Sequence, residues 1–493
     1  MIRGEDSWWS RVRTAAIVVV FMLTALAAGC STSHTAGAPE AYPGRAIGPL
    51  ALGVNVAAWD SIYDHVDPSF IASLLNSAGL QLLRYPGGSW ADEYDWLTDT
   101  DSSNCTGATT NTCSAVDALS FADSSTQARS ADASTFVTVN YGSGTPSEAA
   151  AWVTRAATTN GEAVALWEVG NETYSCYETN HHLADAPTFI KGYTPAGPVC
   201  PSTALMATSY AANVLPYLEA MKRANPTARI GVPWAFNGDQ ATGAGVKDAS
   251  LWNSKVLRAV KSDISFVDAH WYPFNHVSGV TDQQILLSTR RIPAAAAQIR
   301  STLHRDAPGS SFVIGESNIS ERFTTLDFQP VSALFAAATS LAWLSQGAEN
   351  VDWWDLNNFG SPTEGDYGLV SSGSPETQPA GTPFPPYYGE ELASKLTTSG
   401  SHIKAADTGS NNVLGFQSDL GHRRRVLLVN TAPFRISSDT DRWFTAGSDL
   451  DALTYSASTA DAPSPIAQST TTAGRSLVLP AESIVVLTGT FRS

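Results

Sequence analysis

Short apolar runs alternate with amphipathic stretches along most of the chain. Four of these runs are LALGVNVAAW, LQLLRYP, TFVTVNYG and the segment from Ala163 to Val169. They are short and continuously apolar, as parallel β-strands that are covered on both faces should be. Eight such runs, each followed by a helical pattern, predict an α/β protein with a (β/α)8 barrel over residues 45–398.

Start and stop signals place several helices between these strands. Asp67 and Pro68 offer an N-cap and a first helical residue, and Gly79 ends the stretch that follows. Thr145 and Pro146 begin another helix in the same way. Further predicted helices span residues 202–224, 251–261, 282–304 and 331–344, and PPYYGEELASKL forms the last one.

The pattern changes after residue 398. Runs such as VLGFQS, RRVLLVN and SIVVLTGT alternate with Gly, Ser, Thr and Asp turns, and no convincing helical pattern appears. Short strands separated by turn residues are typical of a β-sandwich. We therefore predict an all-β sandwich over residues 399–493, to which Arg45 to Ile47 could add a strand.

Residues 1–30 have the pattern of an export signal peptide. Basic residues precede an apolar run from Ala15 to Ala28, which is too short and too abruptly ended for a membrane span. The run ends in LAAGC, which resembles the lipobox of bacterial lipoproteins and would place a lipid on Cys30. Residues 31–44 then form a flexible linker. We expect an exported protein that is either anchored to the membrane at the cell surface by this lipid or secreted.

The other four cysteines form two local couples, Cys105 with Cys113 and Cys176 with Cys200. An even number of cysteines in an exported chain favours disulfides, although four cysteines allow three connectivities. No histidine accompanies them at the spacing of a zinc site, and we expect no metal. We predict two disulfides that each staple a loop.

Composition bounds the class of protein. The chain has 493 residues, of which 43% are hydrophobic, enough for a large core and for two domains. The net charge of −17 argues against nucleic acid as a partner. Several of the 14 tryptophans lie at predicted strand ends, where aromatic faces often line sugar sites.

A (β/α)8 barrel carries its active site at the C-terminal ends of its strands. The residues at those ends are Asn55, Arg84, Asn140, Asn171, Glu172, Trp234, His270, Tyr272, Glu316, Trp353 and Trp354. This set has two carboxylates among amides and aromatic rings, but no Ser-His-Asp arrangement and no phosphate-binding loop. Two glutamates in such surroundings are what cleavage of a glycosidic bond requires.

Glu168 is a rival carboxylate on the same strand as Glu172. Gly170 lies between them and allows a sharp turn of the backbone before Asn171 and Glu172. We interpret Glu168 as a buried structural residue or as a polar residue of the outer ring, and Glu172 as the residue delivered to the site.

The strand-end motifs LRYPGGSW, WEVGNE, HWYPF, IGESN and WWDL, in this order, resemble those of glycoside hydrolase clan A. Within that clan the chain is most similar to the α-L-arabinofuranosidases of glycoside hydrolase family 51 and their relatives. The resemblance covers roughly residues 45–490. It implies a retaining enzyme without a cofactor, acting on an oligosaccharide or a polysaccharide of plants or cell walls.

Matched position by position, the resemblance implies roles for individual residues. Glu172 matches the acid/base of the clan, Glu316 its nucleophile, and Arg84 the arginine that keeps the nucleophile ionised. The remaining candidates for substrate binding are Asn171, Asn140, His270, Tyr272, Trp234 and either Trp353 or Trp354. In this assignment Asn171 grips the sugar 2-hydroxyl and Tyr272 hydrogen-bonds the nucleophile.

Two alternatives remain open at this point. One is a β-glucuronidase or β-xylosidase of the same clan. A glucuronidase should place a second cation beside the sugar carboxylate, and no such cation is obvious at a strand end. The other is a surface-attached, non-catalytic sugar-binding lipoprotein, whose mark would be the loss of a catalytic carboxylate.

Overall fold

The computed structural model describes residues 44–60, 62–101, 118–176, 178–183, 201–237, 246–361, 363, 365–373, 378–460 and 465–491. These residues fall within one compact unit, Pro43–Ser493. The predicted signal peptide, most of the linker, and Cys30, Cys105, Cys113 and Cys200 lie outside them. Cys176 is disulfide-bonded, and which cysteine it pairs with stays a prediction. No helix among the described residues is long and apolar enough to span a membrane.

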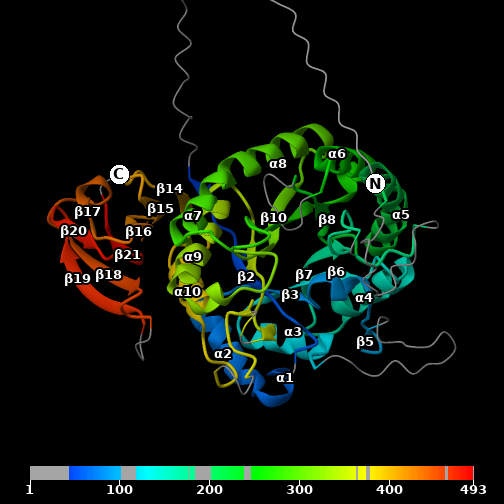
Figure 1. Ribbon diagram of the computed structural model, residues 1–493. Helices are drawn as coiled ribbons and strands as arrows, with labels where there is room; N and C mark the ends of the chain where they lie inside the picture. Colours follow the sequence, from blue (N-terminus) through cyan, green and yellow to red (C-terminus); the bar gives the residue numbers. More distant parts are fainter. Residues whose placement is uncertain are drawn as a thin grey trace, which may run out of the picture. The chain divides into compact units, whose positions relative to one another are not determined.

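Eight parallel strands close into the predicted barrel, in the order β10-β11-β2-β3-β6-β7-β8-β9. The strands are β2 (Leu52–Asn55), β3 (Leu82–Tyr85), β6 (Ser134–Val139), β7 (Val164–Val169), β8 (Ile230–Trp234), β9 (Phe266–Trp271), β10 (Ser311–Ser317) and β11 (Val351–Trp353). Helices surround the strands and cover the outer face of the barrel (Figure 1).

The helices agree with their sequence signals at both ends. They are α1 (Ile62–His65), α2 (Pro68–Ala78), α3 (Phe121–Ser130), α4 (Pro146–Thr158), α5 (Thr203–Ala224), α6 (Ala249–Val260), α7 (Asp282–Leu287), α8 (Ile292–Asp306), α9 (Pro330–Ser345) and α10 (Pro385–Ser394). Asp67 caps α2 by accepting a hydrogen bond from the backbone N–H of Ser69, and Gly79 ends this helix in the left-handed conformation. Thr145 and Glu148 form a capping box at the start of α4.

The single helix predicted over residues 282–304 is wrong in one respect. The segment consists of α7 and α8 with a 3-10 turn, Ser288–Arg291, between them. Pro293 lies in the first turn of α8. Because proline has no backbone N–H and its ring crowds the preceding turn, a continuous helix would be interrupted here.

The C-terminal residues form the predicted β-sandwich. A seven-stranded sheet has the order β1-β14-β15-β16-β21-β18-β19, and β17 and β20 pair beside it. The strands are β1 (Arg45–Ala46), β14 (His402–Ala405), β15 (Val413–Leu420), β16 (Arg423–Asn430), β17 (Ile436–Asp439), β18 (Asp449–Ser456), β19 (Ala467–Thr472), β20 (Ser476–Leu479) and β21 (Ser483–Thr490). The predicted contribution of the chain near Arg45 is confirmed, because β1 pairs with β14.

Strand β16 is buried on both faces of this sheet. Val426 and Leu428 belong to the core that the sheet shares with β20. Leu427 and Val429 point the other way and join the core of the barrel, on a face that contacts α9 and α10. Burial on both sides explains why RRVLLVN reads as a continuous apolar run although its strand is antiparallel.

Four short strands complete the structure on the barrel side. They are β4 (Tyr94–Asp95), β5 (Thr100–Asp101), β12 (Phe359–Ser361) and β13 (Gly365–Asp366). β4 pairs with β5, and β12 pairs with β13. The last two follow β11, so they lie in the loop that leaves the C-terminal end of the barrel.

Candidate active site

The barrel brings together six of the residues predicted from strand ends. They are Arg84 from β3, Asn171 and Glu172 after β7, His270 and Tyr272 at the end of β9, and Glu316 from β10. Hydrogen bonds and ion pairs join all six, directly or through Arg84 and His270. The carboxylates lie far apart in the sequence, and only closure of the sheet places them side by side.

Glu316 is buried and has a partner for each oxygen. Arg84 Nη1 donates to its Oε1 at 2.8 Å, and the hydroxyl of Tyr272 donates to its Oε2 at 2.6 Å. Burial and the charge of Glu172 raise the pKa of Glu316 above its usual value, although His270, Arg84 and Tyr272 act in the opposite direction. The site therefore gives this deeply buried carboxyl two cations and a hydroxyl that favour its ionised form.

Glu172 lies just beyond the turn that follows β7. Gly170 has a φ of 79°, and a Cβ added there would lie 2.5 Å from a methyl carbon of Thr173, so the sharp turn requires glycine. Glu172 itself has a φ of 39°, a region that non-glycine residues rarely occupy. The hydroxyl of Tyr174 donates to Glu172 Oε1 at 3.1 Å.

His270 lies between the two glutamates. Its Nδ1 is 2.8 Å from Glu172 Oε1 and 3.3 Å from Glu316 Oε2. Burial by itself lowers the pKa of His270, but the surrounding carboxylates Glu316, Asp268 and Glu172 raise it well above the usual range. The ring is therefore charged near neutral pH, and both of its nitrogens carry a hydrogen.

The separation of the two glutamates bears directly on chemistry. One carboxylate oxygen of Glu172 and one of Glu316 lie within 4.8 Å of each other. Carboxyl groups about 5–5.5 Å apart suit a double displacement, whereas a water-activating pair needs about 6.5–9.5 Å. The nearest oxygens of this pair lie closer together than either range, which favours the first of the two arrangements.

Arg84 lies beneath this pair and hydrogen-bonds several residues at once. Its Nη2 donates to Glu168 Oε2 and to Asn171 Oδ1, each at 2.9 Å, and its Nη1 also donates to Asn55 Oδ1 at 2.8 Å. Burial alone would lower the pKa of Arg84, but Glu168, Glu316 and Asp268 raise it above its usual value. The guanidinium is thus a permanent cation that links the nucleophile candidate to the amide of Asn171.

Glu168, the rival carboxylate, lies inside the barrel and is fully buried. Its Oε2 accepts from Arg84 and from the Thr138 hydroxyl, the latter at 3.1 Å. Burial and the charge of Asp268 raise the pKa of Glu168 to about 8, against the opposing effects of Arg84 and His270. Glu168 is therefore a buried support of Arg84.

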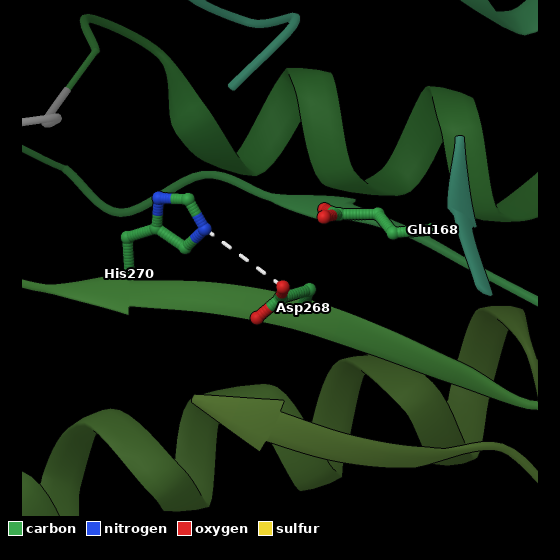
Figure 2. Close-up of side chains that lie close together, drawn as sticks. All are labelled: Glu168, Asp268 and His270. Carbon is green, nitrogen blue, oxygen red and sulfur yellow. Dashed lines mark ion pairs between the residues drawn. The ribbon is translucent and has the colours of Figure 1, made fainter. Parts of the chain in front are cut away.

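Glu168, Asp268 and His270 offer ligand-type atoms within 4.8 Å of one another, which raises the question of a metal ion. Figure 2 shows that Asp268 and His270 come from one strand, β9, with an ion pair between them, while Glu168 comes from β7, which β8 separates from β9 in the barrel order. Arg84 already lies 2.9 Å from Glu168 and 3.6 Å from Asp268. With charged His270 beside them, these carboxylates have cationic partners, so the donor set fits an ion-pair network rather than a metal.

Asn171 is held by two buried acids that sequence reasoning did not assign to the site. Asp92 Oδ2 accepts from the backbone N–H of Asn171 at 3.1 Å. Asp92 Oδ1 accepts from the backbone N–H groups of Tyr141 and Gly142. Glu178 Oε1 accepts from the side-chain amide of Asn171 at 3.3 Å and from the Ser89 hydroxyl. Asp92 thus holds the backbone of Asn171, while Glu178 and Arg84 bind the two ends of its side-chain amide.

Two predicted residues have their polar atoms bound elsewhere, and a third is buried. The amide of Asn140 bonds to Ser143 and Gly144 in its own loop and to the carbonyl of Tyr94 in β4. Trp353 is buried, lies near Phe335 of α9, and donates to the carbonyl of Tyr367. Trp234 is also buried, at the end of β8. Their assignment to substrate binding stays a prediction.

Trp354 lies differently from Trp353. It is partly exposed, and its ring lies against the Gly87-Gly88 turn, where a Cβ added at Gly88 would be 2.6 Å from it. Gly87 faces Trp59, whose ring lies 5.2 Å from that of Trp90. Of the two eighth-strand tryptophans, Trp354 is therefore the one placed to contact a ligand.

A closed (β/α)8 barrel with an appended β-sandwich is also the fold of solved glycoside hydrolases. AbfB, a family 51 α-L-arabinofuranosidase from Bifidobacterium longum, matches with a TM-score of 0.66 and 15% identity, over 91% of this chain and 97% of that chain. An α-L-arabinofuranosidase from Thermotoga maritima, solved with arabinose, matches at 0.62 and 15%, over 91% and 98%.

A family 44 xyloglucanase from Paenibacillus polymyxa, solved with xyloglucan, matches with a TM-score of 0.60 and 12% identity, over 91% of this chain and 98% of that chain. No model of a protein family and no curated protein matches the sequence. At these identities the likeness concerns the fold. The resemblance in fold to the family 51 arabinofuranosidases, which the strand-end motifs predicted, is confirmed.

Proposed function

We propose that the protein is a retaining glycoside hydrolase that works by double displacement. The observation that carries this proposal is the close pair of Glu172 and Glu316, whose oxygens lie within 4.8 Å at the C-terminal end of the barrel. The solved structures with the same fold are glycoside hydrolases, which supports the same chemistry here. No cofactor is needed for it.

The different surroundings of the two glutamates support a division of roles. The side chain of Glu316 is 6% exposed and paired with Arg84, whereas that of Glu172 is 17% exposed. A nucleophile must be ionised without a sheath of water, and an acid/base must reach both the leaving oxygen and water. Glu316 is thus the nucleophile, and Glu172 is the acid/base.

In the first step an oxygen of Glu316 attacks the anomeric carbon, and the bond to the leaving oxygen breaks as Glu172 protonates it. In the second step Glu172 removes a proton from water, which attacks the same carbon and releases Glu316. Tyr272 and Arg84 hold Glu316 in place throughout. The Nδ1 of charged His270 lies 2.8 Å from Glu172 and holds its proton next to this acid/base.

The substrate class we propose is an arabinofuranosyl unit of a plant or cell-wall polysaccharide. The arabinofuranosidases among the structures of the same fold support it. A panel of 4-nitrophenyl furanosides and pyranosides, including the β-xyloside and the β-glucuronide, tests it. Faster turnover of either pyranoside than of the α-L-arabinofuranoside would replace this substrate with the β-xylosidase or β-glucuronidase alternative.

The mechanism is tested with Glu316→Ala and with product stereochemistry. We expect kcat on the best substrate of the panel to fall by about 10⁴-fold or more, since the attacking group is removed. NMR of the first-formed wild-type product should show retention at the anomeric carbon. Wild-type turnover by Glu316→Ala, or inversion at the anomeric carbon, would exclude the mechanism. A wild-type protein that binds oligosaccharides without cleaving them would instead indicate a sugar-binding lipoprotein.

We also propose export and a lipid anchor on Cys30, supported by the LAAGC sequence at the end of the apolar run. The full chain is expressed in a bacterium, and the membrane fraction is compared with that of Cys30→Ala. The variant should leave the membrane fraction, because the acyl chains that hold it would be missing. Equal retention of both proteins would refute the anchor.

A further inference from the structure

The strand that carries Glu316 is irregular just before this residue. In the pairing of β10 with β9, Val313 lies opposite Asp268 and Glu316 lies opposite His270, with a shift of register between the two pairs. β10 therefore advances by three residues, 313 to 316, where β9 advances by two, 268 to 270. An extra residue of this kind is a β-bulge, which redirects the side chains that follow it.

Gly315 lies in this bulge, and side chains bind both of its backbone polar groups. Its N–H donates to Asp268 Oδ1 at 2.6 Å, and its carbonyl accepts from Asn55 Nδ2 at 2.7 Å. Buried backbone groups need partners. These two partners come from β9, which pairs with β10, and from β2, which lies beyond β11 in the barrel order. The bulge is thus clamped from two directions directly before Glu316.

Only glycine leaves room for this clamp. A Cβ built on Gly315 would lie 2.0 Å from Asp268 Oδ2 and 2.5 Å from its carboxyl carbon. Asp268 is fully enclosed, so its side chain has nowhere to retreat. The contact between the Asp268 carboxylate and the backbone of Gly315 is therefore a feature of this pair of residues, and a larger side chain at position 315 would break it.

The second oxygen of Asp268 faces the cations of the site. Asp268 Oδ2 lies 3.6 Å from Arg84 Nε and 3.8 Å from His270 Nε2, and Figure 2 shows the carboxylate directed toward the His270 ring. Arg84 Nε has no hydrogen-bond partner within the described part of the chain, so Asp268 is the acid that balances this edge of the guanidinium. Asn55 also binds Arg84, at 2.8 Å.

Asp268 and Asn55 therefore each touch both the backbone before Glu316 and the arginine that pairs with Glu316. We propose that Asp268 is a positioning residue which, together with Asn55, fixes the bulge at Gly315 and so sets the direction of Glu316 relative to Arg84 and His270. The inference rests on the proposed function, because it assigns Glu316 the role of nucleophile. A small change in that direction matters, since a misplacement of about 1 Å can reduce a rate by about 10²-fold.

Two variants separate the charge contact of Asp268 from the clamp on the backbone of Gly315. Asp268→Asn can still accept from Gly315 N–H, but it removes the charge opposite Arg84 and His270 and places an N–H donor there. Asn55→Ala keeps all charges and leaves the carbonyl of Gly315 without its partner. Both should lower kcat, Asp268→Asn by about 10²-fold, with KM nearly unchanged, because the sugar contacts remain.

Titration of His270 provides a readout that does not depend on activity. Histidine carbons are labelled in the full chain, and the His270 signal is identified by its loss in His270→Asn. The carboxylates of Glu172, Glu316 and Asp268 and the guanidinium of Arg84 face this ring, with Glu168 behind Asp268. Asp268→Asn should lower the pKa of His270 by about 1 to 3 units, and Asn55→Ala should leave it almost unchanged.

Glu390→Gln is the matched control, since Glu390 is a buried carboxyl on α10 that bonds to Ser340 away from the site. It should keep both kcat and the His270 titration of the wild type. Wild-type kcat in both Asp268→Asn and Asn55→Ala, or an unchanged His270 pKa in Asp268→Asn, would overturn the inference. If Asp268→Asn does not fold, Asp268→Ser is measured instead. An inactive wild type with a shifted His270 titration would refute the proposed function but not the charge contact.

Discussion

Two layers of side chains fill the inside of the barrel, and the same strands supply both. An apolar layer includes Leu82, Phe136, Leu166 and Phe266, which pack together with Val313 in one cluster. Two residues further along the same four strands, a charged layer consists of Arg84, Thr138, Glu168 and Asp268. Side chains two residues apart on a strand share a face, so the charged layer lies directly on the apolar one.

The contact between the layers is direct. The guanidinium of Arg84 lies over the ring of Phe136, 5.6 Å from its centroid, and Phe136 meets Phe266 edge to face at 5.8 Å. The apolar layer excludes water from below, which strengthens every charge interaction above it. Along each of these strands, a residue that packs in the apolar layer is followed two positions later by a residue of the charged layer, so stability and chemistry depend on adjacent layers of the same strands.

The largest effect should come from removing the cation of the charged layer. Arg84→Met leaves Glu168, Asp268 and Glu316 without their shared partner. Breaking a buried ion pair from one side costs about 3–5 kcal/mol, so the free energy of unfolding in urea should fall by that amount and activity should be lost. Arg223→Met is the control, because Arg223 pairs with Glu219 and both side chains are exposed, so this change should cost less than about 1 kcal/mol. Similar losses in both variants would contradict the distinction.

A change in the apolar layer should act on stability rather than on chemistry. Phe266→Ala removes a buried ring that packs on Phe136, and we expect the free energy of unfolding to fall by about 3–5 kcal/mol. At a temperature where the variant is folded, kcat should change much less than in Arg84→Met. Urea unfolding and steady-state kinetics on the same preparation check this. A loss of kcat as large as that of Arg84→Met would mean that the two layers are not separable.

The smallest effect should come from Glu168→Gln, and it should depend on pH. The pKa of Glu168 is about 8 in the folded protein, against about 4.3 in an unfolded chain. Between these values the folded state holds a proton that the unfolded chain has lost, so wild-type stability falls as pH rises. The Gln variant lacks this dependence. Its stability relative to wild type should therefore increase from pH 5 to pH 8.

Glu390→Gln sharpens this last prediction. Burial raises the pKa of Glu390 to about 8 as well, so its variant should gain stability relative to wild type over the same pH range. Only Glu168→Gln should also alter kcat, because only Glu168 touches Arg84. A stability difference that does not vary with pH would show that Glu168 is not the group that holds the proton.

Much of the site was predictable because barrel topology assigns strand ends to one face. Arg84, Glu172, His270, Tyr272 and Glu316 follow from strand order alone. Asp268 was not predicted, because parallel strands read as apolar runs and a single acid within SFVDAHW looks like an interruption. Its position two residues before His270, on the same face, was the signal that could have identified it.

Asp92 and Glu178 could not be predicted for a different reason. Asp92 bonds to Asn171 across 79 positions of sequence, from a short 3-10 segment, Gly88–Asp92, that the strand pattern does not mark. Glu178 lies in the loop after β7 and reaches back to Ser89. Loop conformations of this kind depend on contacts between segments and not on the periodicity of either one.

The sequence by itself determined the order of strands and helices, the sandwich that follows, and the two glutamates that strand ends deliver. These follow from local rules: alternation, caps, turns and the side chains that each residue carries. The tertiary structure alone decided that Trp354 rather than Trp353 lies by the Gly87-Gly88 turn, that Glu168 supports Arg84, and that Asp268 and Asn55 clamp Gly315. Such contacts join residues on different strands, and their distances are fixed only when the barrel closes.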